Sequence, residues 1–269
     1  MHIKIYGGLG NQIFQFAAGL TLADDFNLSK IRLDDEGVKN YAVKRESMLN
    51  DFFNFSDLPF DISFSSNFIL KHRLAKLFPF SSSAVTFCSD KNFNKLKNEF
   101  CRNFYLDGYF QNQLNQSDFD RQISFLKPAL KDYSVASIDG AVIHIRGGDF
   151  ISLGWNLVAP LSYYKKAIEH IIKTFNVSRF NIVTDDVKYA SKITTLFSNI
   201  DFNFIGGGVL DDFHLIGAHR FRILSSSTFA LWSSALANND DSVVIAPSFW
   251  KPNSNRAIFL PNEVRLEGF

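Results

Sequence analysis

The sequence predicts an α/β protein with a parallel, Rossmann-like sheet in its C-terminal half. From residue 141 onward, short apolar segments alternate with segments long enough to connect parallel strands as helices. Near the N-terminus, a glycine-rich turn at residues 7–10 separates an apolar strand from an apolar helix. Polar residues follow the C-terminal strands, at the edge where open α/β sheets bind ligands.

The chain begins with a predicted strand at residues 3–6, a loop at 7–12 and a helix at 13–23. A strand, a glycine loop and a helix in this order are typical of nucleotide-binding proteins. The loop lacks the third glycine of the dinucleotide fingerprint, and no later segment is convincing as a second strand that ends in an acid. We therefore do not expect a nicotinamide cofactor.

Residues 50–130 are predicted to be mostly helices and loops. Pro59, Pro79 and the serine run at 81–83 interrupt this stretch, which has no strong period. One compact motif stands out within it, Asp107-Gly108-Tyr109-Phe110-Gln111. We expect a short strand that ends in an aromatic and an amide side chain; a half-buried strand without a functional role is the alternative.

The C-terminal half has the most regular pattern. Its predicted strands are 141–145, 180–184, 202–205, 221–225 and 243–246, and its predicted helices are about 161–175, 186–198, 211–218 and 228–237. Helices between successive strands imply right-handed crossovers and a parallel sheet that is covered on both faces.

The composition is that of a globular protein with a substantial core. The chain has 269 residues, of which 46% are hydrophobic, and a net charge of +1, so nucleic acid is not an expected partner. Cys88 and Cys101 lack metal-ligand or disulfide spacing and are expected to be reduced thiols of a cytoplasmic protein. No apolar run approaches the ~20 residues that span a bilayer, and the N-terminus shows no secretion signal.

The segment from His144 to Phe150 concentrates functional groups where the strand at 141–145 ends. Its glycines allow close approach of the backbone to a ligand, and Arg146 offers a planar donor fork for phosphate. Asp149 can orient that arginine or bind a hydroxyl. The segment therefore predicts a phosphate-facing loop; a strand-to-helix turn with a surface ion pair is the alternative.

The other C-terminal strands end in similar chemistry. Asp185 and Asp186 follow the second strand, a run of three glycines at 206–208 follows the third, and the segment 225–228 opens a helix after the fourth. A helix N-terminus with hydroxyl side chains is an anion site, although N-capping alone would also explain Ser227 and Thr228. For the paired aspartates, helix capping or binding of a ligand hydroxyl is favoured over a Mg²⁺ or Mn²⁺ site.

Together these motifs resemble glycosyltransferase family 11, the α-1,2-fucosyltransferase family of bacterial surface polysaccharides and animal blood-group antigens. The resemblance runs in the same order through nearly the whole chain. The matching segments are Gly7 to Gly19, Asp107 to Gln111, His144 to Phe150, Pro160 to Tyr164, Asp185-Asp186, Ser227 to Trp232 and Val244 to Pro247.

The resemblance implies a GT-B-like fold with two Rossmann-like halves, an acceptor-side domain at 1–135 and a donor-binding domain at 136–269. It implies transfer of L-fucose from GDP-fucose to the 2-hydroxyl of a galactoside, with inversion and without a metal or cofactor. The acceptor is expected to be a galactose-containing glycan or a lipid-linked oligosaccharide, with peripheral contact at the inner membrane face.

The resemblance also implies roles for the donor-binding residues. Arg146 matches the arginine that binds the diphosphate, and His144 beside it is expected to contact the nucleotide sugar. The third motif, expected to hold phosphate, consists of Ser226, Ser227, Thr228 and Phe229.

Further roles are assigned to the glycine loop and to the acids. Asn11, with Gly8 and Gly10, is expected near the fucose and the diphosphate. Asp185 or Asp186 would serve the guanosine or the local network. Asp149 is a candidate general base, although a hydrogen bond to the neighbouring arginine is the preferred role.

Four departures from the family pattern are present. Gly147 stands where the family has a second arginine, Phe150 replaces a tyrosine, and Ser226 replaces an asparagine. The paired tryptophans of the helix that follows are reduced to Leu231-Trp232. Alternatives that stay open are transfer of a related GDP-linked deoxysugar such as colitose, an inactive GDP-sugar-binding homologue, and a metal-dependent transferase.

Overall fold

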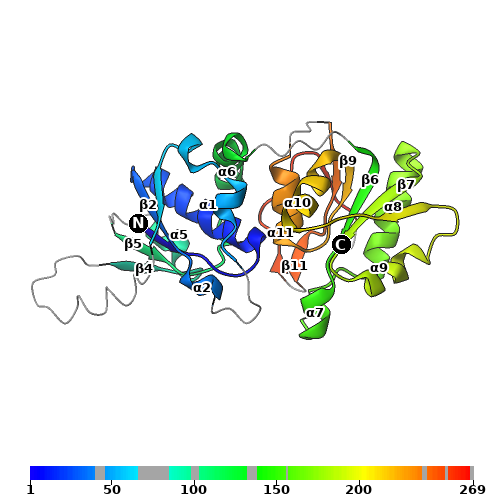
Figure 1. Cartoon of the computed structure of the whole chain (residues 1–269), viewed down its shortest axis with the longest axis horizontal. Helices are drawn as coiled ribbons and strands as arrows, with labels where there is room; N and C mark the ends of the chain where they lie inside the picture. Colours follow the sequence, from blue (N-terminus) through cyan, green and yellow to red (C-terminus); the bar gives the residue numbers. More distant parts are fainter. Residues whose placement is uncertain are drawn as a thin grey trace, which may run out of the picture. The chain divides into compact units, whose positions relative to one another are not determined.

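The computed structural model describes residues 1–39, 46–65, 85–97, 103–131, 138–155, 157–237, 241–251 and 254–266. The chain forms two compact units, Met1–Lys131 and Asp132–Phe269 (Figure 1). The boundary expected at residues 135 and 136 lies outside the described residues. Each unit contains a sheet whose strands pair in parallel, which confirms the predicted α/β class.

The first unit contains a five-stranded sheet in the order β3-β2-β1-β5-β4. Its strands are β1 (His2–Lys4), β2 (Lys30–Asp34), β3 (Asp61–Phe64), β4 (Thr86–Cys88) and β5 (Phe104–Leu106). Its helices are α1 (Leu9–Asp25), α2 (Glu36–Lys39), α3 (Leu49–Phe52), η1 (Phe55–Asp57), α5 (Phe93–Leu96) and α6 (Gln116–Ala129).

Strand β2 corrects one expectation from the sequence, because it is a second strand that ends in an acid. Lys30 and Arg32 are exposed in this strand. Because of these charged residues, the segment does not have the continuous apolar character expected of a parallel strand, and it was not recognised from the sequence. Its terminal Asp34 is buried and accepts a hydrogen bond of 3.0 Å from the Tyr105 hydroxyl. The carboxylate is therefore used inside the unit.

The glycine turn is also shorter than expected. Helix α1 begins at Leu9, so Gly10 and Asn11 lie in its first turn and not in a loop. The helix is buried along most of its length because apolar side chains cover most of its circumference. The N-terminal strand and helix are otherwise confirmed.

The middle of the chain contains more strand than predicted. Strands β3, β4 and β5 have three or four residues each, too short to show a period in the sequence. The motif at 107–111 follows β5 and does not form a strand, which corrects the prediction. Cys88 is a buried free thiol. Pro79, the serine run at 81–83 and Cys101 lie outside the described residues.

The second unit contains a six-stranded sheet in the order β13-β10-β9-β6-β7-β8. Its strands are β6 (Ile138–Ile145), β7 (Arg179–Thr184), β8 (Asp201–Phe204), β9 (His219–Ile223), β10 (Val243–Ile245) and β13 (Glu263–Val264), and β11 (Phe249–Lys251) pairs with β12 (Ser254–Asn255) in a separate hairpin. Its helices are α7 (Gly148–Ser152), α8 (Leu161–Phe175), α9 (Val187–Thr194), α10 (Val209–Ala218) and α11 (Thr228–Ala235).

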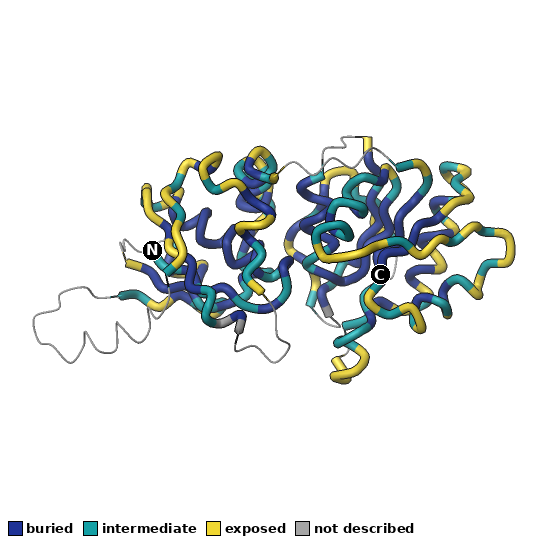
Figure 2. Tube along the Cα trace, viewed as in Figure 1, coloured by how far each residue is buried: buried dark blue, intermediate teal, exposed yellow. Residues whose placement is uncertain are grey.

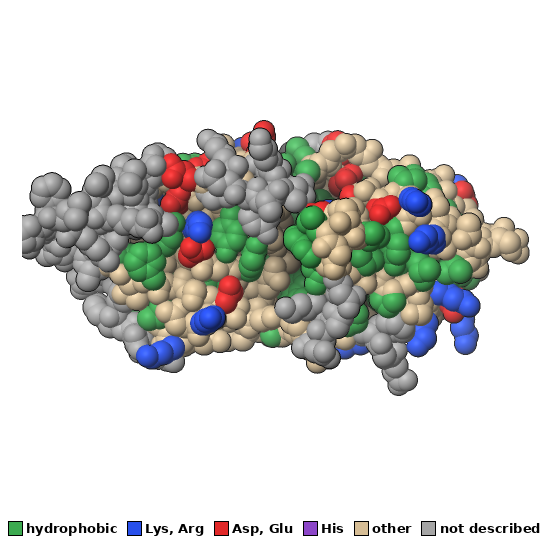
Figure 3. Space-filling model, turned by 90° about the horizontal axis from the view of Figure 1, so that it is seen from below, with side chains coloured by type: hydrophobic (Ala, Val, Ile, Leu, Met, Phe, Trp, Pro, Cys, Tyr) green, Lys and Arg blue, Asp and Glu red, His purple; other side chains and the backbone are tan. Residues whose placement is uncertain are grey.

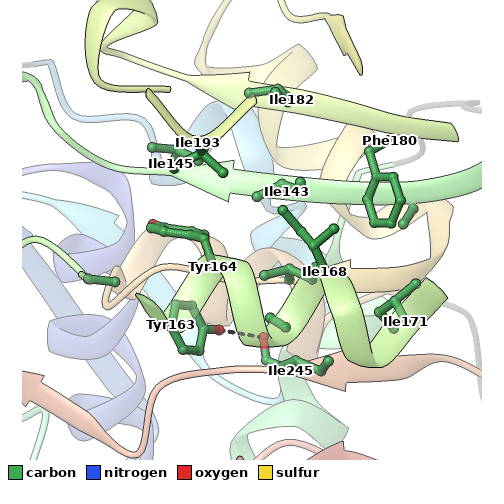
Figure 4. Packing of buried hydrophobic residues seen from close by; sticks show 14 of the residues in the cluster. Ile143, Ile145, Tyr163, Tyr164, Ile168, Ile171, Phe180, Ile182, Ile193 and Ile245 are labelled. Atoms are coloured by element: carbon green, nitrogen blue, oxygen red, sulfur yellow. Dashed lines mark hydrogen bonds between the residues drawn. The ribbon is translucent and has the colours of Figure 1, made fainter. Parts of the chain in front are cut away.

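These elements confirm the predicted alternation. Helix α8 has the predicted bounds, whereas α9 ends at Thr194 and not at residue 198. The central strands of each sheet are largely buried, whereas the edge strands β3 and β8 are mostly exposed (Figure 2). In the second unit, Ile143 and Ile182 of the sheet pack with Ile168 of α8 in one apolar cluster (Figure 4).

Tyr163 of α8 connects this core to the strand ends. Its hydroxyl lies 2.7 Å from the carbonyl oxygen of Leu224 and 3.0 Å from that of Ile245, the second contact being drawn in Figure 4. The ring is fully buried. One side chain thereby holds the ends of β9 and β10 at fixed positions beneath the segment that follows β9.

Candidate active site

The candidate site lies at the carboxyl ends of β6 and β9. From β6 the chain proceeds to β7 and β8 on one side of the sheet, and then to β9, β10 and β13 on the other. Such a reversal of strand order is a topological switch point, where open α/β sheets bind ligands. The predicted residues after β6 and β9 therefore meet at the position that the topology favours.

His144 and Ser225 join the two strands at this point. The Nδ1 atom of His144 lies 2.7 Å from Ser225 Oγ, and its ring lies 5.9 Å from that of Phe229 between centroids. The imidazole is 5% exposed, and burial together with the charge of Arg146 lowers its pKa to about 3. His144 is therefore neutral at physiological pH and can act through hydrogen bonds but not as a cation.

Arg146 is held between two carboxylates. Its Nη2 atom lies 2.6 Å from Asp149 Oδ1, and its Nη1 atom lies 2.6 Å from Asp185 Oδ2. The guanidinium also lies 5.1 Å from the centroid of the Phe150 ring. The preferred hydrogen bond between Asp149 and Arg146 is thus present, and the expected local-network role falls to Asp185.

The two aspartates after β7 do different work. Asp185 Oδ1 accepts a hydrogen bond of 2.8 Å from the Gly147 amide, whereas Asp186 Oδ1 accepts one of 2.9 Å from the Tyr189 amide. Asp186 is therefore the N-cap of α9, one of the roles favoured from the sequence. Asp185 joins the segment after β7 to the loop after β6, and it fixes the backbone next to Arg146.

The same packing explains the glycine at position 147. A Cβ atom added there would lie 2.7 Å from the Cβ of Asp186, closer than such atoms approach in proteins. The second arginine of the family pattern would therefore displace Asp186. In this chain the cap of α9 occupies the space beside the loop.

The segment from Ser226 to Phe229 forms the third part of the site. Ser227 is the N-cap residue of α11, but its side chain makes no capping hydrogen bond. Ser226 is 7% exposed, and its Oγ has no hydrogen-bond partner among the residues that the structure describes. A buried hydroxyl without a partner is energetically costly, so a ligand that accepts a hydrogen bond from Ser226 would be stabilised there. The backbone N–H groups at the N-terminus of α11, which begins at Thr228, are further donors suited to an anionic ligand.

The remaining predicted residues belong to the first unit. Gly8 is the N-cap residue of α1, and Gly10 lies in the first turn of the helix. Asn11 Oδ1 accepts a hydrogen bond of 2.9 Å from Gln111 Nε2, which joins the glycine turn to the motif after β5. The structure thus brings two predicted motifs together. Their approach to a donor sugar stays a prediction.

One supporting residue had no assigned role in the sequence. Tyr163 holds the carbonyl of Leu224, one residue before the Ser225 hydroxyl that contacts His144. The motif at 160–164, which matches the family pattern, was the signal that could have found it. The residue acts by positioning the segment before α11.

Comparison with known proteins identifies the family. The model of glycosyl transferase family 11 matches residues 1–267. The chain belongs to glycosyltransferase family 11. It is therefore a glycosyltransferase, as the resemblance of its motifs implied.

Two relatives of this family member come from Escherichia coli. An alpha-1,2-colitosyltransferase is 28% identical over 266 residues, which cover 92% of this chain and 91% of the relative. The O-antigen biosynthesis glycosyltransferase WbnK is 24% identical over 294 residues, which cover 96% and 97%.

Solved structures confirm the GT-B-like fold of this family 11 chain. The fucosyltransferase NodZ from Bradyrhizobium superposes with a TM-score of 0.56 at 12% identity and covers 88% of this chain and 91% of its own. POFUT1 in complex with GDP-fucose gives a TM-score of 0.53 at 11% identity and covers 98% of both chains. At these identities the likeness concerns the fold.

Two further observations concern metals and membranes. Within the described ranges, no group of three His, Cys, Asp or Glu side chains is arranged to hold a metal ion. No helix in the same part of the chain combines the length and hydrophobicity needed to cross a membrane. The expected independence of metals stays a prediction.

Proposed function

We propose that this family 11 glycosyltransferase transfers L-fucose from GDP-fucose to the 2-hydroxyl of a galactoside, with inversion at the anomeric carbon. The observation that supports this most is the meeting of two strand ends at the switch point, where His144, two residues before Arg146, contacts Ser225 and Phe229. The buried hydroxyl of Ser226 and the N-terminus of α11 belong to the segment between those two contacts. A cation, a hydroxyl and backbone N–H groups at neighbouring strand ends are suited to a diphosphate.

In this reaction the acceptor oxygen forms a bond to the anomeric carbon as the bond from that carbon to the diphosphate oxygen breaks. The acceptor proton passes to a base, and negative charge develops on the leaving GDP. Arg146 and the first turn of α11 stabilise that charge because they are positioned before it develops. His144, which is neutral, contributes hydrogen bonds through its ring nitrogens.

Asp149 takes the role of a positioning residue in this proposal. Its Oδ1 is occupied by the guanidinium of Arg146 at 2.6 Å. A guanidinium has more N–H donors than Asp149 and Asp185 use, so donors remain for the diphosphate oxygens. The two carboxylates fix the orientation of the guanidinium, and its remaining N–H groups are available to the ligand.

Transfer of colitose is a second candidate. One relative is named as an alpha-1,2-colitosyltransferase and is 28% identical to this chain. Colitose differs from fucose by the loss of the 3-hydroxyl, so both sugars present the same anomeric centre to Arg146. We propose that the acceptor in either case is a galactose-containing glycan or lipid-linked oligosaccharide at the cytoplasmic face of the membrane.

The test compares the two donors on one acceptor. Purified protein is incubated with GDP-fucose or GDP-colitose and a simple β-galactoside, with and without EDTA, and products are identified by mass spectrometry. We expect fucosyl transfer that EDTA does not affect. Transfer with colitose alone would establish the second candidate, and loss of transfer in EDTA would establish a metal requirement. GDP binding without transfer to any of a panel of galactosides would favour an inactive homologue.

A further inference from the structure

Exposed hydrophobic side chains lie on two segments beside the Arg146 loop, the segment that follows it and the start of α9. Ile151, Leu153 and Trp155 are 46%, 50% and 40% exposed, and Val187 at the start of α9 is 59% exposed. We call these four residues the apolar tip. Helix α7, which contains the first of them, projects from the second unit (Figure 1). Large apolar side chains gathered in one exposed place commonly mark a binding surface.

The apolar tip is adjacent to the candidate site. Asp149 pairs with Arg146, and Ile151 and Leu153 come two and four residues later in the chain. Val187 follows Asp186, whose side chain packs against Gly147 at the start of the same loop. A surface that binds the tip therefore lies next to the residues proposed to hold the donor.

Basic side chains accompany the tip. Helices α8 and α9 pack side by side and carry lysines at positions 165, 166, 173, 188 and 192, with Glu169 as their one carboxylate. All five lysines are exposed, and four of them lie in the first two turns, toward the end of the sheet where α7 begins. Figure 3 looks onto the side from which α7 projects and shows Lys and Arg beside hydrophobic side chains on the second unit.

We propose that the apolar tip and these lysines dock the protein on the surface of an anionic lipid bilayer. Aromatic and aliphatic side chains insert at the boundary between headgroups and acyl chains, and lysines beside them are attracted by anionic lipids. The net charge of the chain is only +1, so this attraction is a local property of the second unit.

Charge favours a bilayer over a second copy of the chain. In a two-fold dimer the same patch meets itself, so the lysines of both copies would be brought together and would repel each other. An anionic bilayer offers the opposite charge to all of them. In combination with the proposed function, on which this consequence depends, docking would place the donor site where a lipid-linked acceptor is found.

Trp155 supplies a direct measurement of docking. The chain has three tryptophans, and the other two, Trp232 and Trp250, are buried. With vesicles of phosphatidylcholine and phosphatidylglycerol we expect a blue shift of the emission and protection from an aqueous quencher. Pure phosphatidylcholine vesicles should give a much smaller change, and high salt should reverse the binding.

Variants define the surface by co-sedimentation with the same vesicles. Ile151→Ser with Leu153→Ser, and separately Lys188→Glu with Lys192→Glu, should each weaken binding by about tenfold or more. The matched control is Phe204→Ser, because Phe204 is an equally exposed apolar residue of β8 outside the tip, and this variant should bind like the wild type. Turnover of a soluble galactoside should be unchanged in all three.

Two outcomes would overturn the proposal. Equal binding of the tip variants and the wild type would show that the tip does not dock, and a concentration-dependent dimer lost in those variants would show that the tip binds a second copy. Vesicle binding without sugar transfer would leave docking in place and remove the proposed function, so the two failures are distinguishable.

Discussion

The two units present polar side chains at the carboxyl ends of parallel sheets, but they use them differently. In the first unit these groups pair with each other, as Asp34 does with Tyr105 and Asn11 with Gln111. In the second unit Arg146 keeps N–H donors beyond its two carboxylates, and the buried Ser226 hydroxyl has no partner among the described residues. Hydrogen-bonding capacity that the fold leaves unused, more than polarity alone, distinguishes a ligand site.

The largest expected effect comes from removing Arg146, the cation at the carboxyl end of the second unit's sheet. Arg146→Ala should reduce kcat/KM for transfer by about 100- to 1,000-fold, because charge on the departing diphosphate loses its main partner. Lys4→Ala is the control from the first unit, where Lys4 pairs with Asp107 at a similar strand end. Steady-state kinetics with both variants test this, and near-normal turnover by Arg146→Ala would remove the assignment.

The second largest expected effect comes from removing Asp185, one of the two carboxylates that hold the guanidinium of Arg146. Asp185→Ala should lower kcat/KM by about 100-fold, because displacement of a positioned group by about 1 Å has that cost. Asp186→Ala removes only a helix cap and should cost about 1 kcal/mol of unfolding free energy with little kinetic effect. Kinetics and urea unfolding of both variants separate the two neighbours. Equal kinetic losses would contradict their division of roles.

A third change tests the packing beside the loop. Gly147→Arg should destabilise the protein by about 1–3 kcal/mol, because its Cβ would meet Asp186. Combination with Asp186→Gly should recover part of that loss by making room. The unfolding free energies of the two variants decide the point, and a stable single variant with improved donor affinity would show that the space is available.

The most gradual expected effect is the pH dependence of stability. The pKa of His144 is about 3 in the folded protein, against 6.5 for an ordinary histidine. Between these values the unfolded chain binds a proton that the folded state excludes, so stability falls as the pH decreases, by at most about 1.4 kcal/mol per unit for one group.

His2 of the first unit allows the units to be compared in the same experiment. Burial and the charge of the N-terminal ammonium lower its pKa to about 4. Urea unfolding between pH 7.5 and pH 5 should show a flatter slope in His144→Gln and a similar flattening in His2→Gln. An unchanged slope in His144→Gln would mean that this imidazole titrates normally in the folded state.

Sequence analysis predicted the second unit far better than the first, and the reason is physical. Helix α8 repeats its buried and partly buried apolar positions from Leu161 to Phe175, so the predicted range of about 161–175 matches its bounds. Strand β4 has three residues, one of which is exposed, and contains no period to detect. A helix or strand can be recognised from its sequence only when it is long enough to show its hydrophobic period.

The candidate site shows the same limit at the level of contacts. The pair of Arg146 and Asp149 was predictable because both residues lie within one turn of chain. The contact with Asp185 depends on Ile145 lying opposite Thr184 in the sheet, a register that one sequence does not reveal. Local chemistry could be predicted, whereas the partner from the neighbouring strand required the fold.

The two ion pairs of Arg146 also have a consequence for product release, the last step of the proposed reaction. Asp149 and Asp185 place two negative charges against the one positive charge of Arg146. Loss of the sugar exposes a terminal phosphate oxygen, so free GDP carries more negative charge than the sugar nucleotide. We therefore expect the carboxylates that orient the guanidinium to repel the more highly charged product, which favours release of GDP over its retention by an unpaired arginine.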